Sequence, residues 1–199
     1  EAARAGASRE ALQHFEVASR LDRELHGENG DAHHRERIEK GIGLALMNTG
    51  RLPESLPHFD RALVLLGDRP PANAVAVQGK FALDLAAVVG ELYLARTGRT
   101  KRPGSDDDRE FFAILNARAR AAVTSDPRRI FYDNIGGVRR INRIDARSFE
   151  PACPMYAVAG GMFSFSGLSL GIARRFLARA QACRTPGVTS NAFDCRSLE

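Results

Sequence analysis

The sequence of 199 residues predicts an all-α fold of about eight helices, stacked as antiparallel pairs. Apolar residues recur in steps of three and four along most of the chain, and no segment shows the sustained alternation of a strand. A pattern of small and aromatic residues also recurs after 44 residues. Its two copies are Gly6, Ala11, Phe15 and Ala18, and Gly50, Ser55, Phe59 and Ala62. Small residues beside large apolar ones are typical of contacts between paired helices, and such pairs bury their apolar faces by stacking on neighbours.

The second copy of this pattern has an upstream half that recurs near the C-terminus. The two occurrences are Ile42, Gly43 and Leu46 before Gly50, and Ala159, Gly160 and Phe163 before Gly167. The later occurrence is followed by Ala173, Leu177 and Ala180. We interpret each occurrence as a helix–turn–helix unit.

The predicted helices have recognisable ends. In order, they cover residues 8–26, 32–49, 52–66, 73–97, 106–122, 127–147, 150–166 and 168–183. Gly27–Gly30 breaks the first helix, and Asp31 can cap the second. Gly50 can supply the positive φ that ends a helix, and Gly67–Pro71 is a firm stop. The acidic run Asp106–Asp108 favours N-capping and interaction with the helix dipole over metal binding.

Proline marks the starts of three of these helices, because it is tolerated in a first turn. The starts lie at Leu52-Pro53, Asp126-Pro127 and Glu150-Pro151. Pro57 predicts a late start or a slight bend of the third helix.

The predicted organisation is one helical domain over residues 1–184, followed by a loose tail at 185–199. Recognisable repeats cover residues 1–26, 31–67 and 151–183, and a divergent middle covers 72–147. The basic Pro/Gly-containing stretch at 99–105 predicts a flexible loop. The chain begins in helical register without a methionine, so we interpret it as part of a longer protein.

Composition favours a cytoplasmic globular protein. No stretch approaches the ~18 uninterrupted apolar residues of a membrane helix. The three cysteines have no metal-ligand spacing, and their odd number argues against a disulfide framework. The net charge is +5, with almost all basic residues arginine, which we attribute to coding bias rather than to a nucleic-acid surface. One cluster stands out: Arg128, Arg129, Arg139, Arg140, Arg143 and Arg147.

No residue is predicted to be catalytic, and no metal or cofactor site is predicted. Gly41-x-Gly43 lies inside a predicted helix without a preceding strand, which excludes a dinucleotide loop. The five histidines form no HExxH motif. Cys153 and Cys183 lie at the open ends of two paired helices, where partly buried separate thiols are favoured over a redox pair.

The segment Gly50–Leu63 resembles the second half of a tetratricopeptide (TPR) repeat. That motif has a small residue five positions after glycine, an aromatic four further on, and alanine three after that. Residues 6–18 match as well, whereas the C-terminal copy has one extra residue between Gly167 and Ala173, which predicts a longer turn. The resemblance implies an α-solenoid that binds a protein or peptide.

A narrower resemblance concerns the order of four features. They are Leu63–Gly67, a long helix, an Arg-rich helix after Asp126-Pro127, and Met162–Leu168 before Ala173–Ala180. This order is similar to the C-terminal region of large bacterial signalling proteins that join a class III nucleotide cyclase domain, an AAA/STAND-type ATPase and a TPR array. The resemblance implies that any catalytic domains lie upstream, and that the fragment itself is a non-catalytic scaffold whose partners include adjoining domains of the same chain.

The concave face of a TPR array is lined by the first helix of each pair. Here that face is expected to carry Arg37, Lys40, Leu44, Met47 and Asn48, whose basic and apolar character suits an acidic-hydrophobic peptide. The alternative is a helical region of a transcriptional regulator that contacts nucleic acid. Its basic face would be formed by Arg139, Arg140 and Arg143. Neither a membrane nor nucleic acid is the expected partner.

Overall fold

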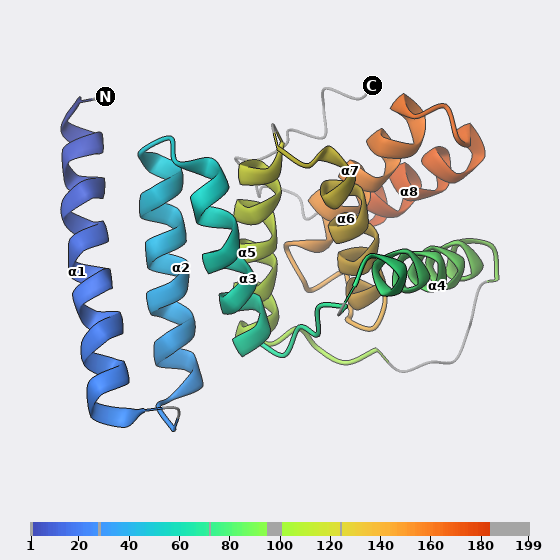
Figure 1. The fold of residues 1–199 in the computed structure, drawn as a ribbon. Coiled ribbons are helices and arrows are strands. Elements are labelled where there is room, and N and C mark those ends of the chain that lie inside the picture. The colour runs from blue at the N-terminus through green and yellow to red at the C-terminus, as the bar shows by residue number, and fades with distance from the viewer. Residues whose placement is uncertain (1, 28, 72, 95–100, 124, 184–199) are drawn as a thin grey trace. The chain divides into compact units, whose positions relative to one another are not determined.

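The computed structural model of the protein describes residues 2–27, 29–71, 73–94, 101–123 and 125–183. These residues form eight α-helices and no strand (Figure 1). The helices are α1 (Ala2–His26), α2 (Ala32–Asn48), α3 (Leu52–Leu65), α4 (Ala74–Tyr93), α5 (Asp106–Ala122), α6 (Pro127–Ile141), α7 (Ala152–Phe165) and α8 (Leu170–Ala182). The predicted all-α fold class is therefore confirmed for the described part of the chain. The predicted tail and residues 99–100 of the predicted loop lie outside the described residues.

Most helix ends follow the local signals in the sequence. Asp31 accepts a hydrogen bond from the His33 backbone N–H at 3.1 Å and caps α2. Gly50 follows α2 with φ of 80°, a backbone conformation that side chains with a Cβ rarely adopt. Gly167 plays the same part after α7, with φ of 67°. Helix α3 begins at Leu52 and contains Pro57, so the late start considered for it does not occur.

Helix α6 ends at Ile141, earlier than the predicted end near residue 147. The backbone there turns to pair with a remote segment. Arg102 donates its N–H to the Arg143 carbonyl oxygen at 3.3 Å, and its own carbonyl accepts from Asp145 N–H at 2.8 Å. The Ile144 side chain between these contacts is completely buried. Burial of Ile144 and the two hydrogen bonds replace the helical bonds that are lost, which local periodicity cannot reveal.

Two compact units make up the chain. The first comprises residues 1–70 and 110–130, and the second comprises residues 71–109 and 131–199. Helices α5 and α6 therefore each contribute to both units.

In the first unit, α1, α2 and α3 run side by side in alternating directions (Figure 1). Contacts between α1 and α2 enclose a core, with Phe15 and Ala18 packed against it. Its members are Leu12, Ile38, Ile42, Ala45 and Leu46. Helices α2 and α3 pack against each other around Phe59, which is fully buried. A Cβ at Gly43 would lie 2.7 Å from the Phe59 ring, so glycine permits this close approach.

The apolar residues that recur along the first predicted helix are only partly buried. Leu12 is buried, but Leu21 and Leu25 are 47% and 75% exposed. Among the described apolar residues of α1, the buried one therefore lies in the part whose pattern matches the repeat.

In the second unit, the hairpin of α7 and α8 is built around stacked aromatic rings. The Phe163 ring lies 5.6 Å from the rings of both Phe131 and Phe176. Tyr156 lies beside Phe176, with centroids 6.5 Å apart. Offset and tilted arrangements of this kind add to the stabilisation from apolar burial. Asn142 accepts the Tyr156 hydroxyl hydrogen bond at 2.6 Å, and burial raises the pKa of Tyr156 to about 12.

The repeat positions predicted from the sequence differ in burial. The buried ones are Gly43, Phe59, Ala62, Gly160, Ala173 and Ala180. The half-buried ones are Ala11, Phe15 and Ala18. The exposed ones are Gly6, Gly50 and Gly167. The last two lie in turns, where conformation rather than burial requires glycine.

The neighbouring glycines of α7 provide a test of helix packing. A Cβ at Gly160 would lie 2.9 Å from the Leu177 side chain and 3.3 Å from the Ala173 carbonyl oxygen, whereas one at Gly161 meets nothing within 4 Å. We expect Gly160→Ala to lower the free energy of unfolding by about 1–2 kcal/mol, because overpacking exceeds the gain in helix propensity. Gly161→Ala should raise it by about 0.5–1 kcal/mol. Chemical unfolding of both variants checks the opposite signs; equal shifts would contradict close packing at Gly160.

Candidate binding surface

The residues expected on the concave face lie along one side of α2, and their accessibility differs. Arg37 and Asn48 are exposed, and Lys40, Leu44 and Met47 are half-buried. We call these five residues the α2 surface. Its polar ends are accessible, while its middle is partly covered.

Lys40 is the most constrained member of the α2 surface. Its ammonium forms an ion pair with the Glu110 carboxylate of α5, a residue 70 positions away in the sequence. Both side chains are about one third exposed, 29% and 32%. The positive charge expected at Lys40 is therefore already neutralised by a neighbouring carboxylate, and Arg37 carries the exposed positive charge of this set.

A second carboxyl group lies beside this ion pair. Glu36 is only 2% exposed, and its Oε1 has no hydrogen-bond partner among the described residues. Burial, together with the nearby negative charge of Glu110, raises the pKa of Glu36 from 4.5 to about 6. Ionised Glu36 is thus costly, and Lys40 offsets only part of that cost. Sequence patterns do not single out Glu36 or Glu110, because the two residues are far apart in the sequence and come together only in the folded chain.

This raised pKa predicts a pH-dependent stability. The pKa of Glu36 is about 6 in the folded state and ordinarily 4.5, and this difference corresponds to about 2 kcal/mol in the free energy of unfolding. That contribution is fully present below about pH 4.5 and is lost as the pH rises through 6. Glu36→Gln removes the ionisation while keeping the shape. We therefore expect the variant to match the wild type near pH 4 and to exceed its stability by up to about 2 kcal/mol near pH 8.

Unfolding by denaturant at both pH values measures this difference. Glu24→Gln, a change at an exposed position of α1, serves as the control and should give no pH-dependent difference. A Glu36→Gln variant that is equally destabilised at both pH values would show that the buried carboxyl group is not a source of instability.

Ion pairs also connect α3 to its neighbours within the first unit. Glu39 of α2 contacts His58 at 2.7 Å and Arg61 at 3.0 Å. Burial alone would raise the pKa of Glu39, but these two partners outweigh it and the pKa is lowered. Asp60 of α3 accepts from Arg118 of α5 at 2.8 Å and also pairs with Arg129. The part of α5 in this unit is thus tied to both helices of the α2–α3 pair.

The alternative basic face lies on α6 and the turn after it, and two of its three arginines are engaged inside the second unit. Arg139 forms an ion pair with Asp84, a buried carboxylate of α4. Arg140 contacts Asp108 at 3.0 Å. Arg143 is exposed. Neutralisation by buried carboxylates leaves Arg139 and Arg140 poorly suited to contact phosphates.

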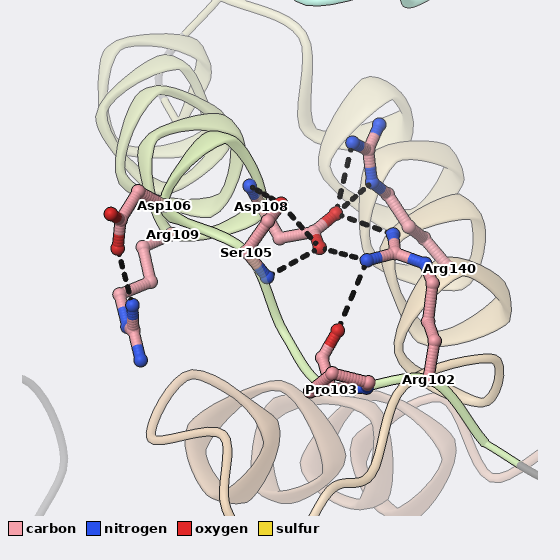
Figure 2. A network of polar contacts seen from close by, with 7 residues as sticks. All are labelled: Arg102, Pro103, Ser105, Asp106, Asp108, Arg109 and Arg140. Atoms are coloured by element: carbon pink, nitrogen blue, oxygen red, sulfur yellow. Dashed lines mark hydrogen bonds and ion pairs between the residues drawn. The ribbon is translucent and has the colours of Figure 1, made fainter.

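Asp108 is the centre of a network of polar contacts in the second unit (Figure 2). Its side chain is 1% exposed and accepts from Arg102 at 2.6 and 2.9 Å, and from Arg140 at 3.0 and 3.1 Å. Ser105 and Asp108 also bond reciprocally through side chain and backbone, which is a capping box. Burial alone would raise the pKa of Asp108, but the donors from Arg102, Ser105 and Arg140 hold it well below its usual range.

The acidic run in the first turn of α5 therefore has a more specific structural role than general capping. Asp106 is almost fully exposed and pairs with Arg109 of the same helix, whereas Asp108 joins three segments. The spacing Ser105-x-x-Asp108 could have revealed the capping box from sequence alone. The two arginine partners could not have been recognised in that way.

The described residues contain no group of three or more His, Cys, Asp or Glu side chains that could hold a metal ion. Cys183 at the end of α8 is half-buried, and burial raises its pKa, which lowers its thiolate fraction and reactivity.

Comparison of the chain with protein-family models, curated proteins and solved structures gave no significant match. Within the part of the chain that the structure describes, no helix has the length and apolar character to cross a bilayer.

Proposed function

We propose that this chain is a TPR-like interaction region of a larger bacterial signalling protein, and that it binds a protein or peptide on the α2 surface. The observation that supports this proposal is how the two helices of each pair pack against each other. Gly43 faces Phe59 between α2 and α3, and Gly160 faces Leu177 between α7 and α8. Two hairpins far apart in the sequence use the same packing device, as expected for units whose role is to stack and present a surface.

The α2 surface combines the two contributions that a peptide ligand needs. Leu44 and Met47 are half-buried apolar side chains that a ligand could cover, and methionine adapts to different partners. Arg37 supplies an exposed positive charge for steering. An acidic-hydrophobic segment fits both. A ligand carboxylate could also compete with Glu110 for Lys40, which would couple binding to the polar contacts of α5.

The nucleic-acid alternative has less support. It depends on Arg139, Arg140 and Arg143, and the first two are paired with Asp84 and Asp108. Contact with a phosphate backbone would require breaking these pairs and removing an arginine partner from each of two buried carboxylates, which is unfavourable. The fragment itself is proposed to be non-catalytic and to act in the cytoplasm with no cofactor.

Site-specific photo-crosslinking tests the proposed function. A photoreactive phenylalanine analogue would replace Arg37 or Asn48 in the full-length protein, and exposed Arg20 of α1 in the control. We expect a discrete crosslinked protein from the α2 positions and none from Arg20. Crosslinks of equal strength from all three positions, or from none, would contradict binding at the α2 surface.

A further inference from the structure

One end of the second unit exposes large apolar side chains from two separate elements. Tyr93 and Leu94, at the end of α4, are 50% and 69% exposed. Phe165, Leu168 and Leu170, in and beside the turn between α7 and α8, are 96%, 68% and 60% exposed. We call these five residues the apolar end. Exposed single apolar residues are common, but a group of this size is typical of an interaction site.

The two elements are held together by contacts that leave these side chains outside. Arg175 of α8 lies 4.1 Å over the Tyr93 ring and donates to the Leu92 carbonyl oxygen at 3.3 Å. Arg179 donates to the Glu91 carbonyl oxygen. A Cβ at Gly171 would lie 3.7 Å from the Tyr93 hydroxyl oxygen. Two arginines thus satisfy carbonyl groups at the C-terminal end of α4, where positive charge is favourable.

The charge around the apolar end selects the kind of ligand. Residues 151–183 contain three arginines and no aspartate or glutamate. Arg174, one turn after Leu170, is exposed. On α4, Asp84 is buried and paired with Arg139, and Glu91 is half-buried. Among the described residues, the apolar side chains are therefore bordered by the exposed Arg174 on a helix pair that contains no carboxylate.

From this juxtaposition we propose that the apolar end is a second docking surface, and that its occupant is a peptide segment with large apolar side chains flanked by carboxylates. Phe165 and Leu168 pack against the apolar side chains of the ligand, and Arg174 attracts its carboxylates. Because the carboxylates complement Arg174, an acidic peptide fits better than a second copy of this basic chain, which would bring arginines together. The site does not involve α2, so it is independent of the surface proposed above.

Selection from a library of random peptides tests this site without knowledge of the natural partner. Peptides of about 16 residues, long enough for about four helical turns, would be displayed on phage and selected on the whole protein. The double variant Phe165→Ser/Leu168→Ser would be used for counter-selection. We expect enriched peptides to combine net negative charge with at least a pair of large apolar residues.

Affinities of the enriched peptides for defined variants complete the test. They should fall about tenfold or more in Phe165→Ser/Leu168→Ser and also fall in Arg174→Glu, whereas Arg37→Glu on the α2 surface should leave them unchanged. Circular dichroism checks that the variants are folded. If the double variant does not fold, the affinity for Arg174→Glu still decides the test. Failure to enrich peptides, enrichment of basic ones, or unchanged affinity in Arg174→Glu overturns the proposal. So does self-association or binding to anionic vesicles that is lost in the same variants, without peptide binding.

Discussion

Replacing Phe59 with alanine is expected to lower the free energy of unfolding by about 3–5 kcal/mol. The side chain is completely buried between α2 and α3, and its ring fills the space that Gly43 leaves open. Removing the ring would leave a cavity that the flanking helices cannot fill, because their backbones already approach closely there. Thermal or denaturant unfolding followed by circular dichroism measures the change.

Phe165→Ala provides the matched control, since the same residue type is 96% exposed there. We expect that change to remain within about 0.5 kcal/mol of the wild type. A loss of stability in Phe59→Ala no larger than in Phe165→Ala would show that Phe59 does not close the α2–α3 pair, and would remove the main support for the repeat interpretation.

Replacing Asp108 with asparagine is expected to cost about 3 kcal/mol or more. Asparagine has nearly the same shape, but its amide NH₂ would face donors that now converge on a carboxylate. Those donors come from Arg102, Arg140 and Ser105 (Figure 2). The variant would therefore lose charge-assisted hydrogen bonds and leave a buried donor without an acceptor.

The pH dependence of this loss can be stated from the lowered pKa of Asp108. A carboxyl group with a lowered folded-state pKa contributes stability above its ordinary pKa and loses it only as pH falls through the folded value. The difference between wild type and Asp108→Asn should therefore persist from neutral pH down to about 4.

The control for this experiment is Asp106→Asn, on the same turn of α5. The Asp106 side chain is 96% exposed and pairs with Arg109 in the same helix, so we expect a change below about 1 kcal/mol. Similar losses in both variants would mean that burial of Asp108 among its arginines has no special role.

The candidate sites differ in how far they could be predicted. The members of the α2 surface share one side of a helix because of their spacing, and this follows from the sequence. The neutralisation of Lys40 by Glu110 does not, since it joins residues 70 positions apart. The apolar end could not be predicted from the sequence for the same reason. Tyr93 and Leu170 belong to different helices, and the arginines that join these helices are an ordinary basic stripe in the sequence.

Features that depend on near neighbours along the chain could be predicted from the residues alone. Helical periodicity, the cap at Asp31 and the positive φ of Gly50 all arise within a few residues. Even the close approach of α2 and α3 could be inferred, because Gly43 and Phe59 lie on consecutive helices joined by a short turn.

Which charges are available to a partner depends instead on how distant segments pack together. Arg139 and Arg140 are an exposed basic face in the sequence, yet they neutralise Asp84 and Asp108. Likewise, α6 ends at Ile141 because the following residues pair with Arg102. The physical reason is the same in each instance. A buried carboxylate or an unpaired backbone group is costly, so the chain satisfies it with whatever donor the fold brings near, regardless of distance in sequence.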